Sequence, residues 1–280
     1  MSALGLAWRP EIALPLAAAA ALYLAGWTRL ARRYPARGRA RLLARLALGL
    51  AGLGAIAVAL LGLHEAAHES FAAHMAQHLL LVAVGVPAIL LADPLSVVLW
   101  ALPRVARRGA GRVLGARSPC RRAWRVLTRM PVAWTAHAAA LWVWHVPALY
   151  DAALTSGLLH DIEHLALAGT AVLFWWPVID PAPHGATAPA GARIVYVVLG
   201  AFQSAALGVV LVSAARPLYA YDAIDDQALG GVLMWGLGGA VDMVAVLVLV
   251  YRFLGAAERG AGLASLTVSG RQGRMNRFDR

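Results

Sequence analysis

Seven apolar runs of about 20 residues constrain the fold of this 280-residue chain more than any other feature. A helix that rises ~1.5 Å per residue needs about 20 apolar residues to cross a ~30 Å hydrocarbon layer. Hydrophobic residues make up 61% of the chain and charged residues 14%, which also excludes a disordered protein. The sequence therefore predicts an all-α integral membrane protein with seven transmembrane helices. The expected spans are residues 12–30, 42–63, 71–92, 132–150, 158–179, 194–214 and 230–253.

The arginines indicate the direction in which these helices cross. All 25 basic residues are Arg, and 23 of them lie in one set of alternate loops, whereas only Arg9 and Arg216 lie in the other. Because arginine-rich loops stay in the cytoplasm, we expect the N-terminus outside and the C-terminus in the cytoplasm. The net charge of +11 then reflects topology and contact with anionic lipids, and it does not indicate a nucleic-acid binder.

The spans form one expected transmembrane domain, residues 1–258. Within it, residues 93–130 are expected to form a cytoplasmic Arg-rich loop, with an amphipathic interfacial helix beginning at Pro94. A basic cytoplasmic tail, expected to be disordered, covers residues 259–280. The single cysteine, Cys120, excludes both a disulfide scaffold and Cys-x-x-Cys metal motifs.

Seven of the nine histidines lie near the outer ends of the second to fifth spans. Six of them form three pairs spaced i, i+4, which a helix presents on one face, one turn apart. Short turns at Glu69–Ser70 and around Ser156 would fold the spans into hairpins, so that pairs on different helices can converge. We therefore expect some of these residues to bind a metal ion. They are His64 with His68, His74 with His78, His160 with His164, and the unpaired His145.

The ligand types favour copper, although ligand softness alone does not separate copper from zinc, and haem is a further alternative. Imidazole binds zinc, copper and iron, and the thioethers of Met75 and Met234 would add soft ligands at a site facing the outside. Acidic neighbours are expected to orient the imidazole rings by hydrogen bonding. These neighbours are Glu65, Glu69, Asp151, Asp161 and Glu163.

Two of the pairs also fit protease motifs. Residues 64–68 read H-E-x-x-H, in which two histidines bind zinc and the glutamate activates water. The longer form of that motif needs a glycine where this chain has Phe71. Residues 160–164 fit the inverted pattern H-x-x-E-H. Both orientations in one chain favour histidine-rich helix ends lined with acids, with an intramembrane zinc metalloprotease as an alternative.

A second polar group is expected inside the membrane. His137 and Asp242 lie at similar depths on the fourth and seventh spans, and Gln203 falls near the same level on the sixth. Because ionisable groups in a bilayer are costly and are usually paired or functional, we expect a contact between His137 and Asp242. It would serve either as a structural clasp or as a proton or ion relay.

The chain resembles the CtaG family of multi-span bacterial cytochrome c oxidase assembly factors. The likeness rests on residues 74–81 with Pro87, on residues 144–151 continued by His160, Glu163, His164 and residues 174–177, and on Asp226, Gln227, Gly230, Gly231, Met234 and Trp235. It implies a plasma-membrane protein that serves the biogenesis of haem-copper oxidases and handles copper on the periplasmic side. It also implies His74, His78, His145, His160 and His164 as the first ligand candidates, with Asp226 and Gln227 as support.

The expected function is therefore copper binding at an outer-face histidine cluster, in a non-enzymatic protein that assists oxidase assembly. Its partners would be haem-copper oxidase subunits and a periplasmic copper carrier. Besides the protease, two alternatives stay open. One is a membrane b-type haem redox protein with two of these histidines as axial ligands, and the other is an assembly scaffold that binds no metal.

Overall fold

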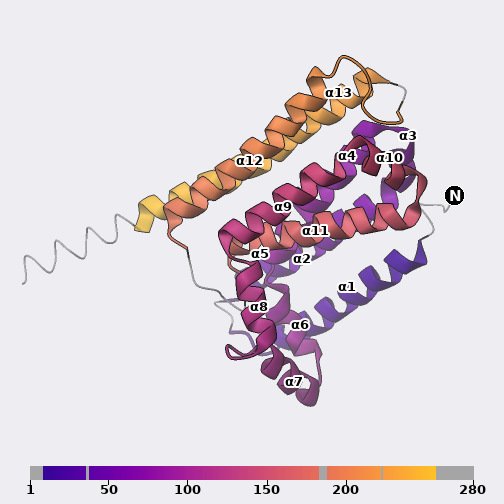
Figure 1. The fold of residues 1–280 in the computed structure, drawn as a ribbon. Helices are drawn as coiled ribbons and strands as arrows, with labels where there is room; N and C mark the ends of the chain where they lie inside the picture. The colour runs from indigo at the N-terminus through magenta and orange to yellow at the C-terminus, as the bar shows by residue number, and fades with distance from the viewer. Residues whose placement is uncertain (1–8, 36–37, 183–187, 222, 257–280) are drawn as a thin grey trace, which may run out of the picture.

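The computed structural model describes residues 9–35, 38–182, 188–221 and 223–256, and this described part of the chain is all helical (Figure 1). Six helical segments in it are long and apolar enough to cross a membrane. They begin and end within a few residues of six expected spans, which confirms the all-helical class and fits a membrane protein, while the seventh span and the orientation stay predictions. The segments are α1 (Pro10–Ala31), α2 with its continuation (Arg39–Gly62), α4 to α5 (Phe71–Leu91), α11 (Gly157–Ile179), α12 (Ala190–Ser213) and the helix that starts with α13 (Ile224–Ala256).

The fourth expected span, residues 132–150, is not one continuous helix. Helix α9 (Met130–Trp144) has 15 residues and ends at His145, and a separate helix α10 (Pro147–Thr155) follows. Because a proline disfavours the α conformation of the residue before it, Val146 is extended, with φ −66° and ψ 123°. The prediction of an unbroken span was wrong, since mean hydropathy does not register this break.

Residues 93–130, the expected Arg-rich connection between the third and fourth spans, contain three short helices. They are α6 (Pro94–Ala101), α7 (Arg104–Leu114) and α8 (Pro119–Leu127). A helix at Pro94 was expected, but α6 is apolar on all sides and packs along α1, with Val97 fully buried. A Cβ atom at Gly26 of α1 would overlap the carbonyl oxygen of Val97, so the two backbones touch. The expected tail at residues 259–280 lies outside the described residues.

The arginine-rich end and the histidine-rich end lie at opposite ends of α1. Arg9, just before α1, hydrogen-bonds Asp161, whereas Arg29 in its last turn donates to the carbonyl oxygen of Ala101 in α6. Next to Arg29, the guanidinium carbons of Arg33 and Arg107 lie 5.3 and 4.7 Å from the ring centre of Trp100. Arg29, Arg33, Arg107 and Trp100 line one surface pocket. A pocket lined by arginines suits anionic lipid headgroups, and lipid contact stays a prediction.

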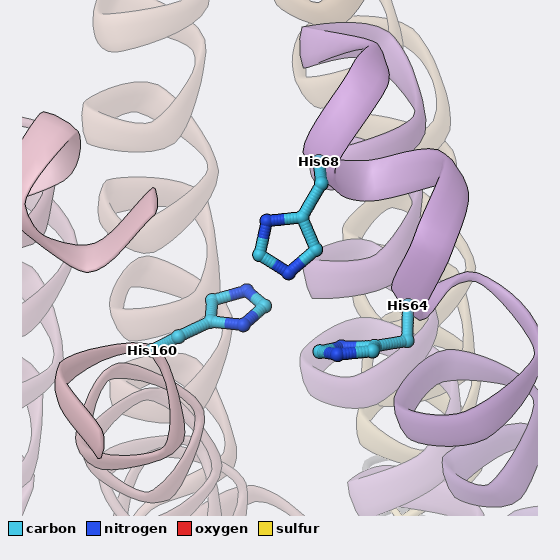
Figure 2. Close-up of side chains that lie close together, drawn as sticks. All are labelled: His64, His68 and His160. Atoms are coloured by element: carbon cyan, nitrogen blue, oxygen red, sulfur yellow. The ribbon is translucent and has the colours of Figure 1, made fainter. Parts of the chain in front are cut away.

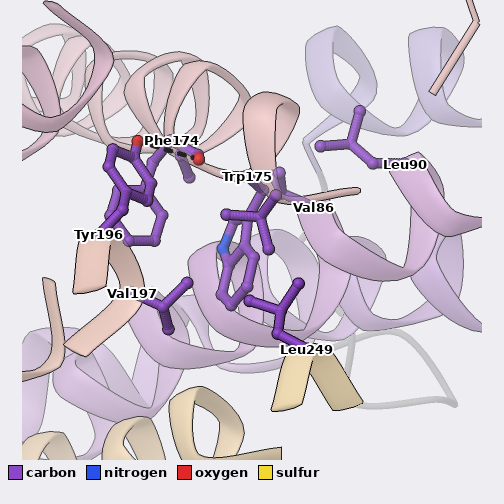
Figure 3. Packing of buried hydrophobic residues seen from close by; sticks show 9 residues of the cluster. Val86, Leu90, Phe174, Trp175, Tyr196, Val197 and Leu249 are labelled. Carbon is purple, nitrogen blue, oxygen red and sulfur yellow. Dashed lines mark hydrogen bonds between the residues drawn. The ribbon is translucent and has the colours of Figure 1, made fainter. Parts of the chain in front are cut away.

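A hydrophobic core holds the long helices together (Figure 3). Trp175 of α11 lies between side chains of α5, α12 and the last helix, and its indole Nε1 donates to the carbonyl oxygen of Val82 at 3.2 Å. The hydroxyl of Tyr196 donates to the carbonyl oxygen of Phe174 at 3.0 Å, while its ring stacks on that residue. The buried members of this core are Val86, Leu90, Ala171, Phe174, Trp175, Val178, Tyr196, Val197 and Leu249.

Three π-helical turns interrupt the spans near the histidines. They are η2 (Val58–Gly62), which precedes α3 (His64–Glu69), η3 (Leu80–Gly85), which follows α4 (Phe71–Leu79), and η4 (Met234–Gly238) after α13 (Ile224–Leu233). A π turn holds one more residue than an α turn and is found frequently at functional sites. Each turn rotates the side chains on its two sides relative to one another.

Candidate metal centre

The turn between α3 and α4 places four histidines beside α11. It is centred on Ser70, which is extended at φ −139° and ψ 128° and caps α4 by accepting from the backbone N–H of Ala73 at 3.2 Å. Asp226 of α13 fixes the same turn, because its carboxylate accepts from the Ser70 hydroxyl at 2.8 Å and from the backbone N–H of Phe71 at 2.6 Å. The expected hairpin turns at Ser70 and Ser156 are both present.

The inner site consists of His74, His78, Glu163 and His164, all buried. The ligand atoms of its three histidines lie within 4.8 Å of one another. The two carboxylate oxygens of Glu163 lie 3.8 Å from Nε2 of His74 and 3.7 Å from Nε2 of His78. Two ligands of one tetrahedral metal ion, bonded at about 2.1 Å, would lie about 3.4 Å apart. The spacing is therefore close to that of ligands around a shared ion.

The polar atoms of this region lack hydrogen-bond partners. Both ring nitrogens of His78, His160 and His164, Nε2 of His74 and both carboxylate oxygens of Glu163 are buried without one. Buried polar groups in proteins are nearly always hydrogen-bonded, since an unpaired group costs roughly 1–3 kcal/mol. A metal ion would accept lone pairs from the carboxylate oxygens and from the unprotonated nitrogen of each ring.

Two tyrosines orient the ring of His74. The hydroxyl of Tyr221 donates to the carbonyl oxygen of Ala67 at 2.6 Å, so its oxygen is free to accept from Nδ1 of His74 at 3.2 Å. The hydroxyl of Tyr150 lies 2.8 Å from the same Nδ1. An Nδ1 that carries the proton leaves the lone pair on Nε2, which faces Glu163. The tyrosines thus hold the ring so that Nε2, which has no hydrogen-bond partner, faces the carboxylate of Glu163.

The outer triad consists of His64, His68 and His160 (Figure 2). Its ligand atoms also lie within 4.8 Å of one another, and the ring centres are 4.9 to 5.7 Å apart. His64 and His68 come from α3, and His160 reaches towards them from α11. His68 is exposed, His64 is partly buried and His160 is 1% exposed, so the triad leads from the surface inwards.

Arg9 lies against the outer triad. One of its terminal nitrogens donates to both carboxylate oxygens of Asp161 at 2.6 and 2.7 Å, and the other lies 3.4 Å from Nδ1 of His64. Partial burial, followed by the charge of Arg9, lowers the pKa of His64 from its usual value. Asp161, expected to orient an imidazole, binds the arginine instead.

His145 belongs to neither group. Its Nδ1 donates to the carbonyl oxygen of Leu141 at 2.7 Å, so the lone pair lies on the buried and unpaired Nε2. It lines a cavity together with His78, Met75 and Met234. The structure thus places the two expected soft ligands beside the inner site and not in the outer triad.

Two other predicted supporting residues, Asp151 and Gln227, form hydrogen bonds with the backbone and not with the imidazoles. Asp151 accepts from the backbone N–H of Ala220 at 2.9 Å, and Gln227 bonds the backbone of Leu218 and Leu211. Glu65 and Glu69 are exposed on α3. Of the predicted acids, Glu163 is the one that faces the inner histidines.

The predicted intramembrane group lines the same cavity as His145. His137, Gln203 and Asp242 all face it, but Nδ1 of His137 lies 3.3 Å from the hydroxyl of Thr170, and Gln203 accepts from Trp142 at 3.0 Å. Among the described residues, no ion pair connects His137 with Asp242. The structure therefore brings the three side chains to one cavity without the expected contact, and the relay stays a prediction.

The sequence model of the family described as cytochrome c oxidase caa3 assembly factor (Caa3_CtaG) matches residues 21–256. The chain belongs to this family. The match confirms the resemblance inferred from the motifs and covers every helix of the histidine region. Neither the curated proteins nor the solved structures contain a match to this chain.

Sequence reasoning missed three residues of the centre in their present roles. Arg9 was counted only as a topological charge, and Tyr150 only as part of a family motif, while Tyr221 was not singled out. Each lies near the end of an expected span, where aromatic and basic residues are usually interfacial anchors. The available signal was their position at the same outer level as the histidines.

Replacing Tyr221 with phenylalanine is expected to weaken the binding of a metal ion at the inner site by about 10- to 100-fold, because one of the two hydroxyls that orient His74 is lost. The measurement is competition with a chromogenic copper chelator. Tyr219→Phe is the matched control, since the Tyr219 hydroxyl donates to the carbonyl oxygen of His145 from the same loop. Equal losses in the two variants would contradict an orienting role for Tyr221.

Proposed function

We propose that this protein binds copper at the inner site and helps to deliver it to a haem-copper oxidase during assembly. The family match supports a role in cytochrome c oxidase assembly. The observation that carries the copper proposal is the set of buried, unpaired imidazole and carboxylate atoms at ligand spacing. Copper is the cargo here and not a resident cofactor, so the protein need not be an enzyme.

The donor set fits a copper ion better than the alternatives considered above. Three imidazoles and one carboxylate suit copper or zinc, and the thioethers of Met75 and Met234 in the adjoining cavity favour copper. A haem would need a flat gap between two axial rings. The rings of His74, His78, His160 and His164 instead contact one another, with centre distances down to 4.3 Å.

The topology that goes with this function has seven spans, with α9 as the seventh. Although α9 is short, it packs along α11 and α12, two of the helices long enough to span the membrane. An odd number of spans puts the two ends of the chain on opposite sides, with the arginines of α7 and α8 in the cytoplasm. The histidines then face the periplasm, where copper carriers and the copper-binding subunit of the oxidase would meet them.

The test is the copper content of the full-length protein purified in lipid nanodiscs. We expect the wild type to bind Cu(I), and His78→Ala combined with His164→Ala to lose the tightly bound ion. His137→Ala is the matched control, because it removes a partly buried histidine outside the cluster. In cells, the double variant should lower the copper content of the oxidase. A wild type that binds no copper would overturn the proposal.

A further inference from the structure

The outer triad shares a residue with the inner region. His160 lies within ligand distance of His64 and His68 on one side, and within ligand distance of His74 and Glu163 on the other. Its ring centre is 5.0 Å from that of His74 and 4.3 Å from that of His164. Both of its ring nitrogens are buried and without a hydrogen-bond partner. His160 can therefore contact an ion held on either side.

Exposure decreases steadily along this line of histidines. His68 is exposed and His64 partly buried, whereas His160, His74 and Glu163 are at most 1% exposed. An ion from outside would meet the triad before the inner site. The structure thus orders the two groups in space, with the outer one accessible to a soluble carrier.

The two groups also differ in the strength with which they can hold a cation. The inner site contains the carboxylate of Glu163 in a buried environment, where charge interactions are strong. The outer triad consists of three imidazoles without a carboxylate, and Nδ1 of His64 faces the guanidinium of Arg9. Since a guanidinium only donates hydrogen bonds, it occupies the lone pair of that nitrogen, and an entering ion must displace it. The outer triad is therefore the weaker of the two.

We propose that the outer triad is a second copper site, which receives the ion from outside and passes it through His160 to the inner site. The inference rests on the proposed copper function and adds a direction to it. Transfer is ligand exchange: bonds from copper to His64 and His68 break first as bonds to His74 and Glu163 form, and the bond to His160 breaks last as His78 and His164 complete the inner site, which leaves His160 free for a second ion. The copper ion keeps its oxidation state, and no electron is transferred.

The test is the number of Cu(I) ions bound and the rate of loading of the full-length protein in nanodiscs. We expect two ions in the wild type, one tight ion in His64→Ala with His68→Ala, and one weak ion in His78→Ala with His164→Ala. An adjacent site presents its ion at an effective concentration of about millimolar. From micromolar copper, the outer variant should therefore load its inner site at least about tenfold more slowly, with unchanged affinity.

The outcomes separate this inference from the function on which it rests. A wild type that binds one ion, or an outer variant that loads at the wild-type rate, would contradict the proposal of a second site. Neither result would contradict copper binding at the inner site. A wild type that binds none would overturn both proposals. Because His68 is exposed and His64 partly buried, the outer variant is expected to fold, and wild-type affinity at its inner site confirms this. Arg9→Gln should tighten the outer site, and an unchanged outer affinity would contradict the role of Arg9.

Discussion

Glu163→Gln is expected to weaken copper binding by about 10²- to 10³-fold, which corresponds to roughly 3–4 kcal/mol. The carboxylate is fully buried, with its two oxygens within 3.8 Å of imidazole nitrogens and no hydrogen-bond donor. An amide of the same shape cannot neutralise an ion held by His74 and His78. The measurement is competition with a Cu(I) chelator of known affinity.

The same substitution should not destabilise the copper-free protein. An unpaired buried carboxyl group opposes folding, so glutamine in its place is expected to leave the unfolding temperature unchanged or to raise it. Glu65→Gln, which removes an exposed glutamate from α3, serves as the control and should change neither quantity. Equal loss of affinity in both variants, or unfolding of Glu163→Gln without copper, would contradict a functional role for this charge.

Gly26→Leu is expected to lower the free energy of unfolding by about 3 kcal/mol or more. A Cβ atom there would overlap the carbonyl oxygen of Val97, which belongs to the backbone of α6 and cannot rotate away. Close backbone contact through small residues is a common means of helix packing in membranes, and here it joins α1 to α6. The measurement is the fraction folded after heating in mild detergent.

The control for this variant is Gly54→Leu. A Cβ atom at Gly54 of α2 would meet nothing within 4 Å, so the added side chain has space. Because leucine favours a helix more than glycine does, by up to about 1 kcal/mol, the control should be as stable as the wild type or more stable. Equal stability of the two variants would show that α1 and α6 pack less closely than described.

The helical class and most of the span boundaries could be predicted from the sequence, because a membrane demands long apolar runs. The convergence of the histidines could be predicted as well, since helical hairpins bring the i, i+4 pairs at their ends to the same level of the membrane. The break at Pro147 and the role of α6 could not, because average hydropathy does not distinguish a helix buried in protein from one that lies in lipid.

The division of the histidines into an inner site and an outer triad could not be predicted from the sequence either. It depends on how far each helix is rotated about its axis, and the π turns η2 and η3 change that rotation on either side of the histidine pairs. The same limit explains His145, which was placed with the other ligands but faces the cavity next to them. The roles of Arg9 and Tyr221 depend on loops whose course no periodic pattern specifies.

The inner site contains a single buried carboxylate, and its charge bears on whether a monovalent or a divalent metal ion binds there. One negative charge cancels the charge of Cu(I) completely, whereas Cu(II) or Zn(II) would keep one uncompensated positive charge in a medium of low dielectric constant. The described side chains around the site supply no second carboxylate. We therefore expect the proposed site to favour monovalent over divalent ions by electroneutrality, independently of ligand softness, so that abundant zinc competes poorly with cuprous copper.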